Sequence, residues 1–257
     1  MPVLNTGLAT PATGDFTIPY SCRFDATSAY LHKTPAGAGN RKTWTFSCWV
    51  KKHWIMGGGA LGYHELFGAD SGDDAEDMIF FDTTTNNLRF VFTGDEQVTA
   101  ADFHDPSAWY HFMVAVDTST AQGTADDRIM MYVNGTRLTD WYGGKDNPAE
   151  DYEFRVNNTV AHYIGLFHRA SYYANITLAE VHFIDGAQLA PASFGETGDY
   201  GEWKPIEVTG VTYGTNGFYL DFADAADLGN DVSGEDNDFT VVGLTAVDQM
   251  LDSPTNN

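Results

Sequence analysis

The sequence predicts an all-β protein built from two antiparallel sheets that pack face to face. Short runs of β-branched and aromatic residues recur along the 257 residues, separated by clusters of Gly, Asp, Asn and Pro, and helical periodicity is scarce. Apolar residues make up 43% of the chain and aromatic residues 14%, which supplies enough large side chains for a substantial core.

The clearest strand pattern lies at residues 44–50. Large apolar side chains alternate there with small polar ones, so that Trp44, Phe46, Cys48 and Val50 share one face. The polar residues between them lie on the other face. The pattern predicts a half-buried strand with its apolar face on the core.

Six further strands are expected from β-branched and aromatic runs, at residues 78–81, 88–92, 110–116, 129–133, 161–165 and 178–184. The dipeptides Asn86-Asn87 and Asn134-Gly135 adopt positive φ angles at low cost, as tight hairpins require. The strands on either side of each dipeptide are therefore expected to pair antiparallel. The polar stretches 117–128 and 140–159 are expected to be exposed loops.

The chain divides by composition into three parts: an N-terminal arm over residues 1–16, a sandwich over 17–195, and an acidic β-rich extension over 196–257. The extension holds 13 carboxylate residues and a single cation, Lys204. Its aromatic residues alternate at strand spacing around Phe218, which a disordered tail would not show. We therefore expect the extension to be ordered by packing on the sandwich or on a neighbour.

The charge balance excludes two classes of partner. Lys and Arg number 13 against 36 Asp and Glu, which gives a formal net charge of -23. This charge repels nucleic-acid phosphates and anionic membrane surfaces, so neither is expected as a partner. The first residues lack a basic start and a continuous apolar stretch, so no signal peptide is expected.

The two cysteines, Cys22 and Cys48, lie in apolar runs without metal-ligand spacing. Two buried thiols are the simpler interpretation, and a disulfide between neighbouring strands is the alternative.

Four segments carry aromatic and aliphatic residues in a recognisable order. They are residues 24–31, residues 44–51, the pair 109–116 and 128–135, and the pair 163–165 and 176–183. Together these segments resemble the laminin-G and pentraxin domains of the concanavalin A-like superfamily, over about residues 17–195. The resemblance implies a two-sheet jelly-roll sandwich.

The C-terminal part carries a second resemblance, in residues 213–222, 228–231, 237–240 and 252–257. These segments are similar to one that follows a concanavalin A-like domain in virion proteins of tailed bacteriophages. The resemblance implies a non-catalytic virion structural protein, either a surface decoration or a tail or fibre attachment protein, assembled in the host cytoplasm. It also implies other virion proteins as partners and a homo-oligomer, taken to be a trimer by analogy.

Exposed aromatic residues in loops are the candidates for binding host glycans, because sugar rings stack their apolar faces on Trp and Tyr. The candidates flanked by Gly or polar residues are Trp54, Tyr63, Trp141, Tyr142, Tyr172 and Tyr173. No cofactor is required by this function. Calcium is the expected cation where carboxylates cluster in flexible loops, at Asp70, Asp73, Asp74, Asp77, Asp126 and Asp127.

Catalytic motifs are missing from the sequence. No strand carries the alternating carboxylates with which retaining glycosidases place two groups about 5 Å apart. Two alternatives to the virion protein remain: a free carbohydrate-binding lectin module, and a glycan hydrolase whose carboxylates come from different strands.

Overall fold

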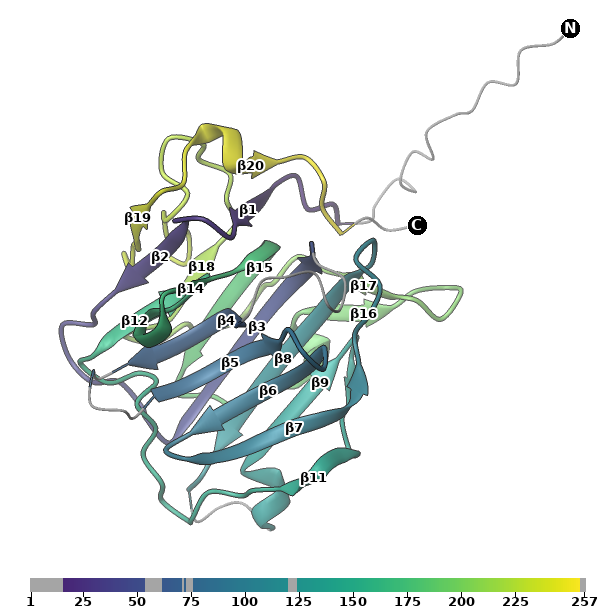
Figure 1. Cartoon of the computed structure of the whole chain (residues 1–257), viewed down its shortest axis with the longest axis vertical. Helices are drawn as coiled ribbons and strands as arrows, with labels where there is room; N and C mark the ends of the chain where they lie inside the picture. The colour runs from purple at the N-terminus through teal and green to yellow at the C-terminus, as the bar shows by residue number, and fades with distance from the viewer. Residues whose placement is uncertain (1–15, 54–61, 71, 73–75, 120–123, 255–257) are drawn as a thin grey trace, which may run out of the picture.

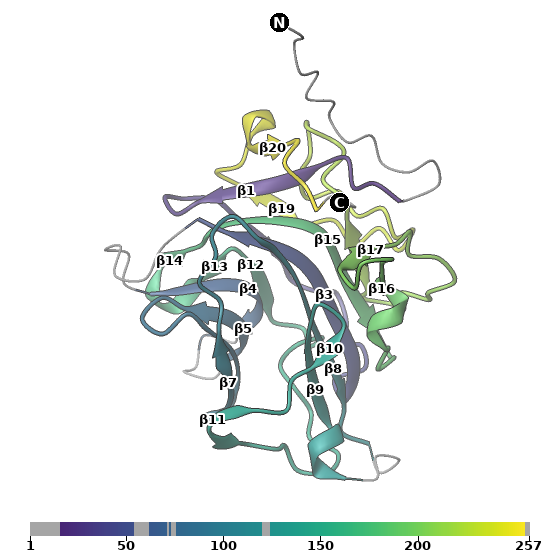
Figure 2. The same cartoon turned by 90° about the vertical axis from the view of Figure 1, so that its right-hand side faces the viewer.

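The computed structural model describes residues 16–53, 62–70, 72, 76–119 and 124–254. Two antiparallel sheets of eight strands each form the protein, as the sequence predicts. Figure 2 shows the sheets edge-on as two curved layers that face each other. Among the described residues, no helix is long and apolar enough to cross a membrane.

Sheet A has the strand order β10 (Thr136–Arg137), β9 (Ile129–Val133), β8 (Trp109–Asp117), β3 (Thr43–Lys52), β15 (Asn175–Asp185), β1 (Ser21–Asp25) and β20 (Gln249–Met250), and β18 (Phe218–Leu220) also pairs with β15. Sheet B has the order β11 (Trp141–Lys145), β7 (Asp95–Asp102), β6 (Asn87–Phe92), β5 (Glu76–Asp82), β4 (Tyr63–Asp70), β12 (Ala161–Ile164), β2 (Tyr30–Lys33) and β19 (Thr240–Val242). Figure 1 views the molecule with sheet B toward the reader.

Two short hairpins and four 3-10 turns complete the fold. The hairpins are β13 (Leu166–Phe167) with β14 (Tyr172–Tyr173), and β16 (Gly195–Thr197) with β17 (Trp203–Pro205). The turns are η1 (Ala125–Asp127), η2 (His168–Ala170), η3 (Pro191–Ser193) and η4 (Ala246–Asp248).

The core fills the space between the sheets with aromatic rings. Phe46 of β3 stacks on Phe67 of β4 with ring centroids 4.9 Å apart and planes 9° apart. Trp44 meets Phe90 and Phe154 edge-on, at 5.9 and 5.6 Å. The Phe46–Phe67 and Trp44–Phe90 pairs join sheet A to sheet B, and all three pairs add to the free energy of burying the rings.

The turn predicted at Asn134-Gly135 is confirmed: both residues have positive φ, 46° and 74°, and they connect β9 to β10. The prediction of an exposed loop over residues 140–159 is wrong in part, because residues 141–145 form a strand. Trp141 and Lys145 of β11 pair with Thr99 and Gln97 of β7. The glycines at the centre of β11 hide the alternation that identifies a strand from sequence.

The strand at residues 44–50 is buried on both faces, whereas a half-buried strand was predicted. Trp44, Phe46, Cys48 and Val50 face the core as expected. The opposite face is also closed, with Ser47 1% exposed, because residues of the C-terminal extension lie over the outer face of sheet A.

Both cysteines are free buried thiols. Cys22 lies on β1 and Cys48 on β3, and β15 separates the two strands. Because two strand spacings separate them, the Cα atoms of Cys22 and Cys48 are about 10 Å apart, beyond the roughly 7 Å that a disulfide can bridge. The alternative of a disulfide between neighbouring strands is therefore wrong.

The extension contributes strands to both sheets: β18 and β20 belong to sheet A, and β19 belongs to sheet B. Phe218, Leu220 and Phe222 are buried in the same core as Phe46. Figure 1 shows the yellow strands β19 and β20 lying beside the purple strands β2 and β1 from the other end of the chain.

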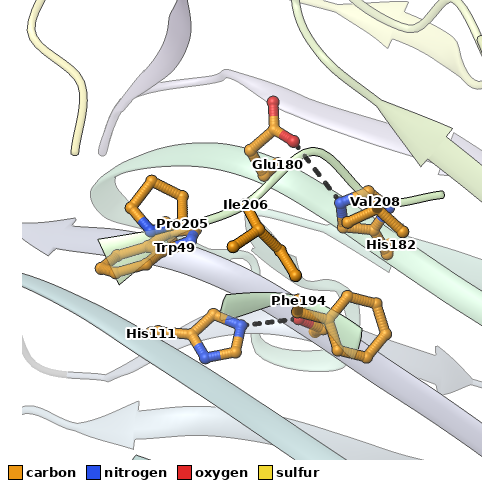
Figure 3. A pocket seen from close by; sticks show the side chains of 9 residues that line it. Trp49, His111, Glu180, His182, Phe194, Pro205, Ile206 and Val208 are labelled. Carbon is orange, nitrogen blue, oxygen red and sulfur yellow. Dashed lines mark hydrogen bonds and ion pairs between the residues drawn. The ribbon is translucent and has the colours of Figure 1, made fainter. Parts of the chain in front are cut away.

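A polar junction fixes the extension on the outer face of sheet A, and Figure 3 shows it from close by. The junction joins Ser47, Trp49, His111, Glu180 and His182 of sheet A to Phe194, Pro205, Ile206 and Val208 of the C-terminal part. Side chains fill it completely, because no volume remains that a water molecule could occupy.

Hydrogen bonds link several of the polar groups inside this junction. The indole N–H of Trp203 donates to Nδ1 of His111 at 3.1 Å, and Nε2 of His111 lies 2.8 Å from the Ser47 hydroxyl. The hydroxyl of Tyr219 donates to the carboxylate of Glu180 at 2.8 Å. Burial lowers the pKa of His111 to about 3, so the imidazole is neutral at physiological pH.

We expect His111→Gln to reduce the pH dependence of stability. The folded-state pKa of His111 lies below its unfolded value of about 6.5, so its contribution is present above that pH and is lost as the pH falls toward about 3. Urea denaturation at a series of pH values should give a variant slope shallower by about 1.4 kcal/mol per pH unit between about pH 6 and 4. Ser47→Ala is the matched control, since it lowers stability but keeps the imidazole and therefore the slope. An unchanged slope in His111→Gln would contradict the assignment of a buried neutral imidazole.

We expect Phe218→Ala to destabilise the whole protein by about 3–5 kcal/mol, because it opens a cavity in the common core. Chemical denaturation followed by tryptophan fluorescence should still show one transition. Tyr200→Ala is the control, since that ring is 94% exposed and its loss should change stability by less than about 0.5 kcal/mol. Two separate transitions would show that the extension folds independently.

Candidate functional site

The hairpin β13–β14 lies on the outer face of sheet B and carries two of the aromatic residues singled out from sequence. Its apolar anchor is Phe167, which packs against Met78 and Phe80 of β5 together with Tyr63 of β4. Ring centroids of Tyr63 and Phe80 are 4.3 Å apart. The hairpin is therefore seated on the sheet by apolar burial.

Charged groups hold the η2 turn at the tip of this hairpin. His168 Nδ1 lies 3.2 Å from Asp70 Oδ2, and Arg169 Nη2 lies 3.3 Å from Glu76 Oε1. The imidazole of His168 also stacks on Tyr163 at 4.8 Å with planes 9° apart. Because the side chains of His168 and Arg169 are about half exposed, these contacts orient the turn more than they stabilise it.

A hollow of about 150 Å³ opens between this hairpin, the start of β4 and the turn after β1. Tyr63, Tyr172 and Tyr173 line it together with Ala26, Gly62, His64 and Ser171. Tyr172 meets Tyr63 edge-on with ring centroids 6.1 Å apart and remains 36% exposed. The hollow therefore exposes the ring of Tyr172. The ring of Tyr63 beside it is held in place by its packing against Phe80 and Phe167.

Local backbone geometry places Tyr172 at the hollow. Ser171 adopts the left-handed conformation with φ 54°, which reverses the chain so that Phe167 pairs with Tyr172. Gly62 has φ 145°, and a Cβ there would lie 2.6 Å from the Tyr172 ring. The ring thus lies directly on the Gly62 backbone, an approach that only glycine permits.

Further aromatic side chains continue from the hollow across β2 and β12. Tyr30 lies 6.2 Å from Tyr173 and 6.2 Å from Tyr163, measured between ring centroids. His32 lies 6.2 Å from Tyr163. Together these residues form an aromatic surface on the outer face of sheet B.

The six aromatic candidates do not form one site. Trp141 and Tyr142 lie on β11, four strands from β4, which is about 19 Å at a strand spacing of about 4.8 Å. Tyr142 is 73% exposed, and Lys145 Nζ lies 5.4 Å from the Trp141 ring centroid. Trp54 lies outside the described residues.

The acidic candidates are likewise distributed over the molecule. Asp77 points into the interior, where it accepts hydrogen bonds from the backbone N–H groups of Arg155 and Val156, and burial raises its pKa to about 6. Asp70 is on the outer face of sheet B, where it meets His168 as described above. Asp73 and Asp74 lie outside the described residues.

Asp126 and Asp127 already have partners at η1. Asp127 Oδ1 lies 2.7 Å from Arg137 Nη2, and Asp126 Oδ1 accepts a hydrogen bond from Asn147 Nδ2 at 2.7 Å. In the part of the chain that the structure describes, no three His, Cys, Asp or Glu side chains are grouped so as to hold a metal ion. Calcium binding stays a prediction.

Carboxylates from different strands do meet on the outer face of sheet B. Glu65 and Asp70 of β4 lie near Glu76 of β5, and burial followed by these two charges raises the pKa of Glu65 well above its usual range. Glu65 is 2% exposed and Glu76 8%, beneath the η2 turn. Asp70 and Glu76 contact the η2 turn of the hairpin through His168 and Arg169.

The Ser47–His111 pair is arranged against nucleophilic catalysis. In a catalytic triad a carboxylate accepts the second N–H of the histidine, which leaves the other nitrogen free to take the serine proton. Here the Trp203 N–H donates to Nδ1, so the neutral ring carries its proton on Nε2 and donates it to Ser47. The pair is also sealed beneath the extension.

Sequence reasoning missed Gly62, Ser171, Tyr30 and Tyr163 as parts of the site. The alternation of Tyr30 and His32 with Leu31 could have identified their face of β2. Their proximity to Tyr173 and Tyr163 depends on the pairing of β2 with β12, which no local pattern reveals.

Comparisons with known proteins find partial similarity to solved structures. No family model and no curated protein matches the sequence.

The chain is similar to the SAP-like pentraxin of Limulus polyphemus, with 13% identity and a TM-score of 0.48 over 80% of this chain and 94% of that one. It is similar to domains LG4-5 of the mouse laminin alpha1 chain, with 13% identity and a TM-score of 0.45 over 83% and 52%. It is also similar to tailspike protein 2 of Escherichia coli O157:H7 bacteriophage CAB120, with 11% identity and a TM-score of 0.41 over 71% and 28%. Each of these is a partial likeness of fold.

Proposed function

We propose that this protein binds a carbohydrate without catalysing its cleavage, and that the hollow at Tyr172 is the binding site. The observation that carries the proposal is the gathering of Tyr63, Tyr172 and Tyr173 around one accessible hollow. Sugar rings bind by stacking their C–H faces on such rings, while tyrosine and serine hydroxyls exchange hydrogen bonds with the sugar hydroxyls.

The size of the hollow suits one sugar ring rather than a cofactor. Its volume of about 150 Å³ is below the roughly 300–1,000 Å³ typical of enclosed small-molecule sites. The rest of a glycan would extend over the neighbouring aromatic surface at Tyr30 and Tyr163. A free lectin module would use the same hollow, so this part of the proposal does not depend on where the protein is found.

We place this binding function in a tailed-phage particle, as a surface decoration or a tail or fibre attachment protein. The support is the resemblance of residues 213–222, 228–231, 237–240 and 252–257 to virion proteins. In this proposal the partners are other virion proteins, and the protein forms a homo-oligomer, taken to be a trimer, since phage surface proteins occupy symmetric positions. Assembly would take place in the host cytoplasm.

We expect Tyr172→Ala to weaken glycan binding by about 3- to 10-fold, because an aromatic contact is worth about 0.5–1.5 kcal/mol beyond area burial. A glycan array identifies the ligand, and isothermal titration then measures its affinity. Tyr142→Ala is the matched control, since it removes an exposed tyrosine from β11 and should leave the affinity unchanged. Equal affinity in Tyr172→Ala and the parent protein would exclude this hollow.

Repeating the titration with a calcium chelator tests the calcium prediction.

We expect cryo-electron microscopy of the purified particle to show density for this sandwich on the capsid or tail surface. Light scattering of the isolated protein should give three times the mass of one chain. A protein that is absent from purified particles would be a free lectin module instead, and a monomer both in solution and on the particle would contradict the trimer.

A further inference from the structure

The hollow at Tyr172 is uncharged. Among the described residues that line it, none is Lys, Arg, Asp or Glu. A ligand in the hollow therefore meets aromatic rings, hydroxyl groups and backbone.

The one ionisable ring in the lining, besides the tyrosines, is held neutral. His64 Nδ1 accepts the backbone N–H of Asn175 at 3.0 Å, which places the proton of the neutral ring on Nε2. Burial, followed by the charge of Lys52 on β3, lowers the pKa of His64 to about 4. The imidazole therefore gives no positive charge to a ligand at neutral pH.

Two cationic side chains, Lys52 on β3 and Arg169 in the η2 turn, contact other groups. Lys52 is completely buried, and its ammonium donates to Asn86 Oδ1 at 2.8 Å and to the carbonyl of Phe103. Arg169 contacts Glu76, and its guanidinium lies 5.8 Å from the Phe167 ring centroid. Neither presents a cation to the lining of the hollow.

Carboxylates lie on two sides of the hollow. Asp25, the last residue of β1, precedes Ala26 of the lining, and Asp70 and Glu76 lie under the hairpin that carries Tyr172. The whole chain adds a formal charge of -23. An anionic sugar would lose water from its carboxylate or sulfate without gaining a cation, and the field of the protein would repel it.

From this arrangement we infer that the site selects neutral sugars and rejects sialic acids, uronic acids and sulfated sugars. The inference rests on the proposed glycan binding at Tyr172 and specifies its substrate class. Neutral sugars offer C–H faces for the rings and hydroxyl groups that both donate and accept, which match the uncharged polar groups of the lining.

Matched pairs of glycans test the inference. Lactose is compared with sialyllactose, and glucose-terminated oligosaccharides with their glucuronic-acid counterparts, on an array and then by titration. The neutral member of the bound pair should bind at least about 10-fold more tightly, with less than about twofold change between low and high salt, because no ion pair is formed. Tyr172→Ala should weaken this binding, and Tyr142→Ala should not.

Each other outcome overturns the inference in a distinguishable way. Preferred binding of the acidic member that is lost in Tyr172→Ala and weakened by salt would leave the proposed function standing and make the charge argument wrong. Acidic binding that is unaffected by Tyr172→Ala would locate the glycan site elsewhere. Binding of neither class would overturn this inference together with the proposed function.

Discussion

The inner faces of the two sheets meet through a column of aromatic rings, in which Phe46 of sheet A stacks on Phe67 of sheet B. Since side chains alternate along a strand, the rings that point inward also determine which residues point outward. A bulge between Glu65 and Phe67 adjusts this register in β4, so that Phe67 stays in the core while Tyr63 and Glu65 remain on the outer face. The binding hollow therefore depends on the packing of the core beneath it.

The C-terminal part of the chain covers the outer face of sheet A around Ser47, His111 and His182. The junction around His111 is filled by side chains, and its polar groups are paired with Trp203 and Ser47. Glu180 in the same junction has φ 48° at a bulge in β15, where the carboxylate receives the Tyr219 hydroxyl. This position with positive φ lies where the extension attaches, and the hollow at Tyr172 lies on the other side of the sandwich, at sheet B.

The hairpin β13–β14 connects the acidic outer face of sheet B with the hollow. Apolar contacts of Phe167 seat the hairpin, and the contacts of His168 with Asp70 and of Arg169 with Glu76 orient its turn. Negative charge is thereby used to position a binding ring and, in our proposal, to exclude anionic ligands from the same place. One feature of the composition, the excess of carboxylates, accounts for both effects.

The sequence by itself determined the all-β class, the antiparallel pairing through turns such as Asn134-Gly135, and the inner face of residues 44–50. These features depend on periodicity and local turn chemistry, which neighbouring residues encode. It also identified Tyr63, Tyr172 and Tyr173 as candidates, because aromatic residues beside small or polar ones stand out locally.

Only the tertiary structure decided which candidates meet. The separation of Trp141 and Tyr142 from Tyr172 follows from the strand order of sheet B, and the burial of Ser47 follows from the extension lying over it. Asp77 was expected in an acidic loop, yet it faces the interior because its position in β5 alternates with that of Glu76. Contacts between strands far apart in the chain depend on loop closure and packing, which no local pattern specifies.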